Sequence, residues 1–257
     1  GADVLLIERE FLLGGLATLG LVTIYLPLCD GRGHQVSFGI AEELFRLSIC
    51  HGAEANYPTA WLDGGTDAEK AEGQRFEVRY NAHLFALEAE KLLLKSGVKI
   101  LYGTTVCAAH KTDGKIDALI VENKSGRYAV GVSNSVVDCT GDADICGLAG
   151  APTVLKSGGN GLASWYYYFD GAKVRLKMFG LADVVPDESD NVRADGSDTY
   201  SAGKTESLDQ NYRFSGVDGY ELSRAVLAGH GRMLDDILTQ RGGNPELVPV
   251  TMSTIPL

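Results

Sequence analysis

Hydrophobic positions along the chain form short continuous runs separated by stretches in which apolar residues are spaced three or four apart. Val4 to Ile7 is a continuous apolar run of the kind found in strands buried on both faces of a parallel sheet. Val98 to Tyr102 and Ser135 to Cys139 are short, largely apolar stretches that we also expect to be strands. The spaced pattern predicts helices over Ile40 to Cys50 and Asn81 to Lys95. This alternation predicts an α/β protein.

The helix predicted from Asn81 to Lys95 is the most clearly delimited in the chain. Asn81 is a suitable N-cap, and Ser96-Gly97 provides the stop. Its apolar surface is expected to come from four leucines, Leu84, Leu87, Leu92 and Leu94.

Three β segments follow, with a different texture from the αβ units around them. They run from Thr104 to Ala109, Ile116 to Glu122 and Arg127 to Val132, and the turn signals Asp113-Gly114 and Ser125-Gly126 separate them. We expect an antiparallel meander within residues 104–132.

The pattern changes again in the last hundred residues. Leu162 to Phe169 is a predicted strand, and Asp183 to Gln210 is a predicted acidic loop. Asp218 and Glu221 form a capping-box pair that opens a helix. The apolar face of that helix is expected to carry Leu222, Val226, Met233 and Ile237. We therefore expect two domains, residues 1–158 and 159–257.

Composition narrows the function classes. A net charge of −11 and an isoelectric point of about 4.9 exclude the clustered Lys and Arg that nucleic-acid binding requires. The chain has neither an apolar run long enough to span a bilayer nor a secretion signal, so we expect a cytoplasmic protein that makes no membrane contact.

The five cysteines, an odd number without a CxxC pair, predict free thiols in a reducing compartment. Cys29 and His34 would lack two further ligands, so no metal site is expected.

Three short stretches could carry chemistry, and each has a structural alternative. Glu8 ends a strand, where a carboxylate can accept hydrogen bonds from both ribose hydroxyls, or can simply be solvated. Gly14-Gly15 allows backbone N–H groups to approach a phosphate, or serves a turn with positive φ. Thr140-Gly141-Asp142 precedes a predicted short helix ending near Gly150, where amides can meet an anion or Asp142 can act as N-cap.

The order of these stretches is more specific than any one of them. VLLIEREFLLGGLATLG, then VKILYGTTV, the meander and SVVDCTGDADICGLAGAP resemble the FAD-dependent oxidoreductases with a glutathione-reductase-type flavin domain. The resemblance implies a Rossmann-like FAD-binding domain with an inserted β-meander, followed by a second, α+β substrate domain.

The same resemblance implies site residues. Glu8 would bind the adenosine ribose, and Arg9 would lie beside the adenine. The remaining positions would contact FAD largely through the main chain: the pyrophosphate and ribityl path at Gly14, Gly15 and Leu16, the adenine edge at Thr105 and Val106, and a second loop at Thr140, Gly141 and Asp142.

The implied activity is hydride transfer between a small-molecule substrate, or NAD(P)H, and flavin N5. GGLATLGLV contains no cysteine pair, which disfavours thiol–disulfide chemistry. Arg32 and His34, in CDGRGH, are candidate catalytic residues that could stabilise a reduced flavin or a carboxylate substrate; the alternative is a polar surface turn.

Relatives of this type carry a first strand with GxGxxG before the position of Glu8, where this chain has seven residues, and continue beyond its C-terminus. We therefore expect a chain truncated at both ends that binds FAD weakly or not at all. Two alternatives are an NAD(P)-binding Rossmann dehydrogenase, which the meander and TGDAD disfavour, and a non-catalytic fragment without cofactor.

Overall fold

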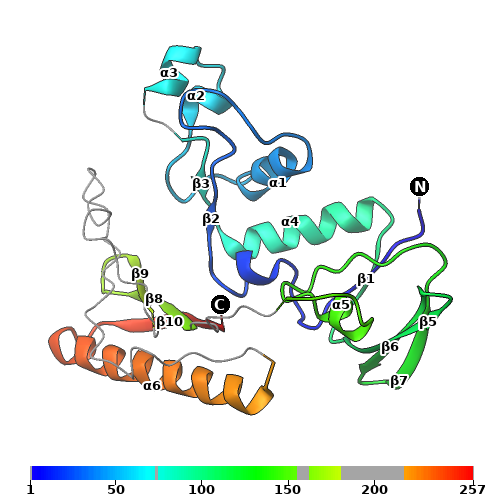
Figure 1. Ribbon diagram of the computed structural model, residues 1–257. Helices are drawn as coiled ribbons and strands as arrows, with labels where there is room; N and C mark the ends of the chain where they lie inside the picture. Colours follow the sequence, from blue (N-terminus) through cyan, green and yellow to red (C-terminus); the bar gives the residue numbers. More distant parts are fainter. Residues whose placement is uncertain (1, 73–74, 155–161, 181–216, 257) are drawn as a thin grey trace. The chain divides into compact units, whose positions relative to one another are not determined.

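A computed structural model describes residues 2–72, 75–154, 162–180 and 217–256 (Figure 1). The chain divides into two compact units, Gly1–Thr153 and Val154–Leu257. The expected boundary after residue 158 lies outside the described residues.

A short parallel pair of strands forms the αβ part of unit 1. Strand β1 (Leu5–Ile7) pairs with β4 (Lys99–Leu101), with Leu5 opposite Lys99 and Ile7 opposite Leu101. Helix α4 (Ala82–Lys95) precedes β4, as a crossover between parallel strands requires. Both predicted strands, before Glu8 and before Tyr102, are therefore confirmed, and the structure adds that they are neighbours.

Helix α4 begins as predicted but buries a different face. The Asn81 side chain accepts hydrogen bonds from the N–H groups of His83 and Leu84. The buried positions are Ala82, Phe85 and Ala86, whereas Leu84, Leu87 and Leu94 are exposed. The expectation that these leucines form the packed surface of the helix was wrong. The residues that face the core are spaced three or four apart, and this series begins at Ala82.

Residues 24–80 form a small lobe of unit 1. The antiparallel strands β2 (Ile24–Tyr25) and β3 (Val78–Arg79) lie with helices α1 (Ile40–Ser48), α2 (Thr59–Leu62) and α3 (Asp67–Ala71). The lobe's buried cluster is Leu28, Phe45, Phe76 and Val78. Helix α1 was predicted. Helix α3 was not, although its capping box of Thr66 and Glu69 is visible in the sequence.

The β-meander is confirmed as a three-stranded antiparallel sheet. Its order is β5 (Thr105–Thr112), β6 (Lys115–Asn123) and β7 (Gly126–Gly131). Asp113 and Gly114 join the first two strands with φ angles of 52° and 78°, the positive pair that a type I′ turn requires.

Ser135–Cys139 is not a strand, which corrects the prediction. Val136 packs against the meander, and Val137 is 80% exposed. Asp138 turns its carboxylate toward the backbone that follows, so the apolar run serves as a connection into α5 (Asp144–Leu148) rather than as a buried strand.

Unit 2 consists of a three-stranded antiparallel sheet and one long helix. The strand order is β10 (Val248–Pro256), β8 (Leu162–Phe169) and β9 (Val174–Gly180). Helix α6 (Gly219–Gly243) is capped by Asp218 and packs on β8 and β10. The predicted loop from Asp183 to Gln210 lies outside the described residues.

The apolar face predicted for α6 is confirmed. Leu222 and Val226 pack around Ala225, and Met233 and Ile237 pack with Tyr166 of β8. Within the described ranges, no helix combines the length and the apolar character needed to cross a bilayer.

Candidate functional site

Glu8 lies where the parallel strands end. Its N–H donates to the Leu101 carbonyl at 3.0 Å, and its own carbonyl accepts from the Thr104 N–H at 3.1 Å. The half-buried carboxylate accepts from the N–H of Glu10 through Oε1 at 2.8 Å. These bonds hold a carboxylate at the C-terminal edge of the parallel pair, the edge at which α/β proteins bind nucleotides.

The start of β5 lies beside Glu8. Thr104 is buried. Its hydroxyl donates to the Tyr102 carbonyl at 2.9 Å and accepts from the Asn123 side-chain amide at 3.1 Å. This fixes the backbone that leads into Thr105 and Val106. The sequence could indicate a strand here, but it did not reveal that the buried Thr104 joins that strand to the end of β1.

Arg9 points away from any enclosed site. Its guanidinium Nε lies 3.3 Å from the Glu10 carboxylate, and its side chain is 73% exposed. The next aromatic residue, Phe11, lies against the turn between β4 and β5. Its ring is so close to Gly103 that a Cβ on that glycine would lie 2.7 Å from it. The segment after Glu8 therefore lies against the β4–β5 turn.

Tyr102 is a neighbour of Glu8 that the sequence did not single out. Burial, the hydrogen bond from its hydroxyl to Glu90 and the nearby charges of Glu90 and Glu8 raise the pKa of Tyr102 to about 12. The hydroxyl therefore stays protonated and remains a donor to Glu90 at neutral pH.

Gly14 and Gly15 form a tightly held loop. Gly14 has a φ of 101°, and a Cβ there would lie 2.6 Å from Thr18 Cγ2, so glycine is required for both conformation and space. The buried Thr18 hydroxyl donates to the Leu13 carbonyl at 2.5 Å. Gly14, Gly15 and Leu16 are exposed, within and beside the short 3₁₀ turn η1 (Gly15–Ala17).

Tyr80 fixes this loop from inside the unit. Tyr80 is buried, and its hydroxyl lies 3.0 Å from the carbonyl oxygens of both Ala17 and Val22, which share its single proton. Sequence reasoning missed Tyr80, because it lies about sixty residues from the loop that it holds. The loop keeps an exposed outer edge and a fixed inner one.

Asp138, rather than Asp142, organises the Thr140-Gly141-Asp142 turn. The N–H groups of Thr140 and Cys146 donate to the two Asp138 carboxylate oxygens at 3.0 and 2.9 Å. The Thr140 hydroxyl accepts from the Asp144 N–H at 2.9 Å. The alternative of an N-cap by Asp142 was therefore wrong: Ala143 occupies the N-cap position.

The hydrogen bonds to Asp138 also fix its charge. Although burial opposes ionisation, the donors from Thr140 and Cys146 outweigh it and lower the pKa of Asp138 to about 2. Thr140, Gly141 and Asp142 themselves are exposed.

One hydrophobic cluster joins three of the predicted stretches. Ile7 directly precedes Glu8, Val106 is itself a predicted contact, and Ile145 follows the Thr140 turn; all three belong to the cluster around Leu119 and Val121. Stretches separated by about a hundred residues in the sequence are thus brought together beneath the candidate site.

The catalytic candidates Arg32 and His34 lie elsewhere, in an exposed turn. The Asp30 carboxylate accepts from the N–H groups of Arg32 and His34 at 2.7 and 3.1 Å, and its second oxygen lies 3.0 Å from His34 Nδ1. The Arg32 N–H and the His34 ring lower the pKa of Asp30 to about 2. The geometry matches the polar surface turn that was the alternative interpretation.

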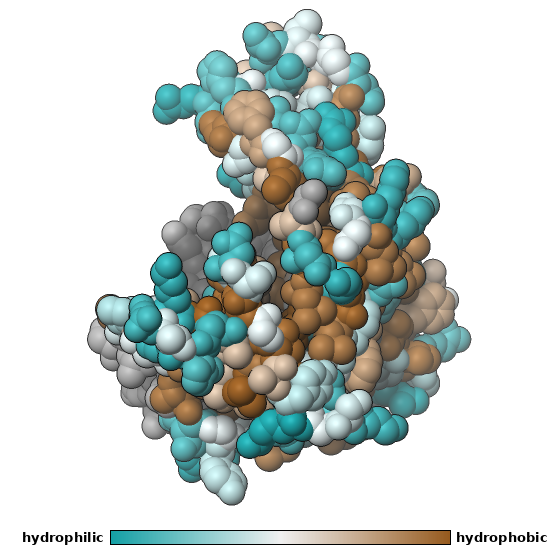
Figure 2. All heavy atoms as spheres, turned by 90° about the vertical axis from the view of Figure 1, so that its right-hand side faces the viewer, coloured by the Kyte–Doolittle hydropathy of each residue, from teal (hydrophilic) through white to brown (hydrophobic). Residues whose placement is uncertain are grey.

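Apolar side chains remain exposed in unit 1. Figure 2, seen from the side of Figure 1 that carries α4, α5 and β5–β7, shows hydrophobic atoms gathered among hydrophilic ones. Exposed apolar residues around β1 and in the segment after it include Val4, Leu5, Phe11 and Leu16, with exposures of 43%, 40%, 82% and 51%. Such surface is typical of a region that contacts a ligand or further protein.

The mixed α/β architecture and the carboxylate at the end of a parallel strand are consistent with a Rossmann-like dinucleotide-binding protein. A sequence model of the family described as FAD dependent oxidoreductase matches residues 1–241. The chain belongs to this family, and the family's cofactor is FAD. No curated protein matches the chain.

Solved structures show a distant likeness to this chain. A geranylgeranyl bacteriochlorophyll reductase-like protein from Thermoplasma acidophilum is 10% identical, with a TM-score of 0.42 over 72% of this chain and 44% of that one. CabE, an aromatic hydroxylase from angucycline biosynthesis, is 15% identical, with a TM-score of 0.46 over 99% of this chain and 52% of that one.

The glycerol-3-phosphate dehydrogenase from Bacillus halodurans, solved with FAD, is 11% identical, with a TM-score of 0.38 over 66% of this chain and 36% of that one. The chain thus spans about half or less of the length of these proteins. Likenesses at this level do not define a substrate or a reaction.

The residues at the end of β1 suit the adenosine half of FAD. A fixed carboxylate at Glu8 matches a ribose diol, and the exposed residue Thr105 lies next to it through Thr104. The fit at the flavin ring is different: Arg32 and His34 are held in their own turn by Asp30.

Proposed function

We propose that unit 1 binds the adenosine end of FAD in an oxidoreductase with a glutathione-reductase-type flavin domain. The observation that carries the proposal is the hydrogen bond from the Thr104 N–H to the Glu8 carbonyl, which puts the β1 carboxylate beside the start of β5. The family match supports FAD as the nucleotide and disfavours the NAD(P) alternative.

In this proposal the residues of unit 1 bind and orient. Glu8 accepts hydrogen bonds from the ribose hydroxyls, with its backbone fixed by Leu101 and Thr104. The main chain at Thr105 and Val106 meets the adenine edge. Gly15 lets the backbone approach the pyrophosphate, because a Cβ there would project into open space. Gly14 keeps the shape of the loop beside it, because a Cβ there would meet Thr18.

FAD, when bound, supplies the hydride chemistry that the side chains of this chain cannot supply themselves. The substrate in the proposal is a small molecule, with NAD(P)H as a possible electron donor. The Thr140 turn contributes backbone amides on a loop that Asp138 holds rigid. Rigid placement of a binding loop reduces the entropy cost of holding a ligand.

Equilibrium dialysis against FAD, FMN and NAD⁺ tests the proposal. We expect weak binding of FAD that is still tighter than that of NAD⁺, and no binding of FMN, which lacks the adenosine. Glu8→Gln removes the charge that strengthens the ribose hydrogen bonds, so FAD affinity should fall about tenfold to a hundredfold.

Glu10→Gln is the matched control, because Glu10 is an exposed carboxylate two residues away that contacts Arg9. It should leave the affinity within about twofold, the scale of an exposed ion pair. Equal retention of FMN and FAD, together with identical affinities for the two variants, would contradict an adenosine site at Glu8.

A further inference from the structure

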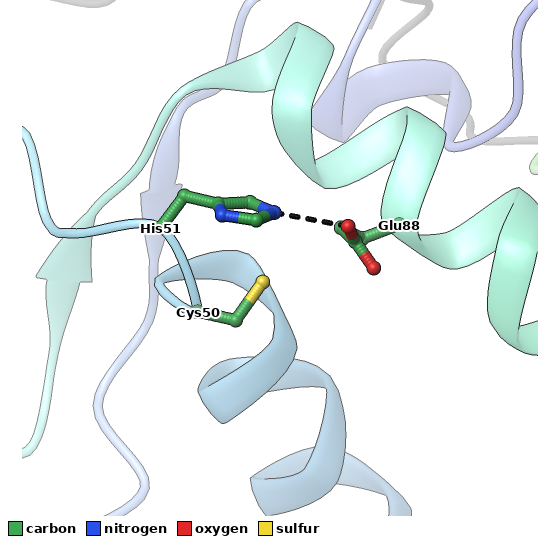
Figure 3. Close-up of side chains that lie close together, drawn as sticks. All are labelled: Cys50, His51 and Glu88. Carbon is green, nitrogen blue, oxygen red and sulfur yellow. Dashed lines mark hydrogen bonds and ion pairs between the residues drawn. The ribbon is translucent and has the colours of Figure 1, made fainter.

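We propose that Cys50, His51 and Glu88, which the fold brings together from the turn after α1 and from helix α4, bind a Zn²⁺ ion through sulfur, nitrogen and oxygen. Their candidate ligand atoms all lie within 4.8 Å of one another. Figure 3 shows His51 and Glu88 facing each other, with the Cys50 sulfur pointing toward the space beside them.

The backbone on both sides of the cluster is fixed. After α1, the N–H of Cys50 donates to Leu47 and that of Gly52 to Ile49, at 3.3 and 2.8 Å, so the turn that carries Cys50 and His51 is closed. Glu88 lies in the second turn of α4, whose N-terminus Asn81 caps. Helices α1 and α4 contact each other, so the packing of these two helices brings the Cys50–His51 turn close to Glu88.

Small side-chain movements would complete the coordination. Zinc takes thiolate at about 2.3 Å and imidazole nitrogen or carboxylate oxygen at about 2.1 Å, so ligand atoms in a tetrahedral site lie about 3.5 Å apart. His51 Nε2 and Glu88 Oε1 are now 2.9 Å apart, in a hydrogen bond. That bond must lengthen, and the sulfur must move closer to the other two ligand atoms by about 1.3 Å at most.

The side chains have the freedom to make this change. Cys50 is exposed, the His51 side chain is 52% exposed, and Glu88 is 19% exposed. Exposure also gives a metal ion direct access from solvent. The fourth position would be held by water, as in zinc sites with three protein ligands.

The ligand set selects the metal. Thiolate and imidazole are softer donors than the oxygens that Mg²⁺ and Ca²⁺ require, so the set favours Zn²⁺. On binding, zinc replaces the thiol proton of Cys50, which passes to solvent, and no oxidant or reductant is needed.

Lys91 is the competing cation. Its ammonium lies 3.2 and 3.3 Å from the two Glu88 oxygens, and its side chain is 74% exposed. Because an exposed lysine can swing into solvent at little cost, it opposes the metal only weakly. The zinc site does not rest on the flavin proposal, since none of its residues belongs to the adenosine-site group.

The test uses the whole chain, reduced and freed of metal with a chelator. Zinc stoichiometry and affinity are measured by calorimetry, and Co²⁺ serves as the spectroscopic probe. We expect one Zn²⁺ per chain and a near-ultraviolet charge-transfer band from thiolate to cobalt. Cys50→Ser should remove the band, and His51→Gln or Glu88→Gln should weaken zinc binding by more than about tenfold.

Two controls separate this site from adventitious binding. Cys139→Ser alters the other fully exposed cysteine and should leave the band and the affinity unchanged. Lys91→Gln should strengthen binding about two- to fivefold, because it removes the competing charge. Circular dichroism of each variant is recorded to check that the variant is folded. A band that persists in Cys50→Ser, or affinities that none of the three ligand substitutions changes, would overturn the proposal.

Discussion

Asp138 shows how a single carboxylate can position a loop without itself meeting a ligand. Both of its oxygens accept main-chain N–H groups, from Thr140 and Cys146. The sequence drew attention to Thr140-Gly141-Asp142 because glycine and helix-start residues stand out there. It could not identify Asp138, because the run SVVDC has the composition of a buried strand and only tertiary structure turns the carboxylate toward α5.

Asp138→Asn is expected to destabilise unit 1 by about 1 kcal/mol, the usual cost of a lost capping bond, because the amide can accept with only one atom. The pKa of Asp138 is lowered to about 2, below its unfolded value of about 4, so its stabilisation is present above pH 4 and is lost as the pH falls toward 2. The difference between wild type and variant should therefore shrink below pH 4.

Urea unfolding followed through Trp61, in a Trp165→Phe background, measures this change for unit 1. Asp142→Asn is the matched control, since Asp142 is exposed in the same turn. Equal destabilisation by the two substitutions, or a difference that stays constant between pH 6 and pH 3, would contradict the role of Asp138.

At the scale of elements, the sequence predicted those whose signals are local. The meander depends on the turn residues Asp113 and Gly114. Helices α4 and α6 start after the N-cap residues Asn81 and Asp218, which can be recognised in the sequence itself. The strand predicted at Ser135–Cys139 is absent, because a short, largely apolar stretch becomes a strand only if a neighbouring strand pairs with it. The prediction that the leucines of α4 form its packed surface was wrong for a related reason, since apolar character alone does not determine which face of a helix packs.

Helix α6 offers the sharpest test of element packing. Met233 is 1% exposed and packs against Tyr166, whereas its neighbour Leu234 is 55% exposed. Met233→Ala should destabilise unit 2 by about 2–5 kcal/mol, because it leaves a cavity between helix and sheet. Leu234→Ala should change stability by less than about 0.5 kcal/mol.

Trp165, buried in β8, reports this unfolding in a Trp61→Phe background. A similar loss of stability for both alanine variants would show that α6 does not pack on the sheet through the Met233 face.

At the scale of the whole molecule, the chain belongs to the FAD dependent oxidoreductase family. It divides into two compact units. The sequence indicated FAD through the order of its motifs, and the family match confirms the cofactor. Thr104 and Tyr80, which hold parts of the candidate site, were not predicted, because each contacts a segment distant from it in sequence. Asp138 was not predicted, because its carboxylate turns toward the backbone that follows only in the folded chain.

The most direct measurement of the adenosine-site proposal is saturation-transfer difference NMR of FAD with the whole chain, because this method detects weak binding and reports which ligand protons touch protein. We predict the strongest transfer to the adenine and ribose protons, weaker transfer to the flavin methyl groups, and loss of the ribose signal in Glu8→Gln but not in Glu10→Gln. No transfer to adenosine protons, or transfer that is strongest at the flavin methyl groups and unaffected by Glu8→Gln, would contradict it.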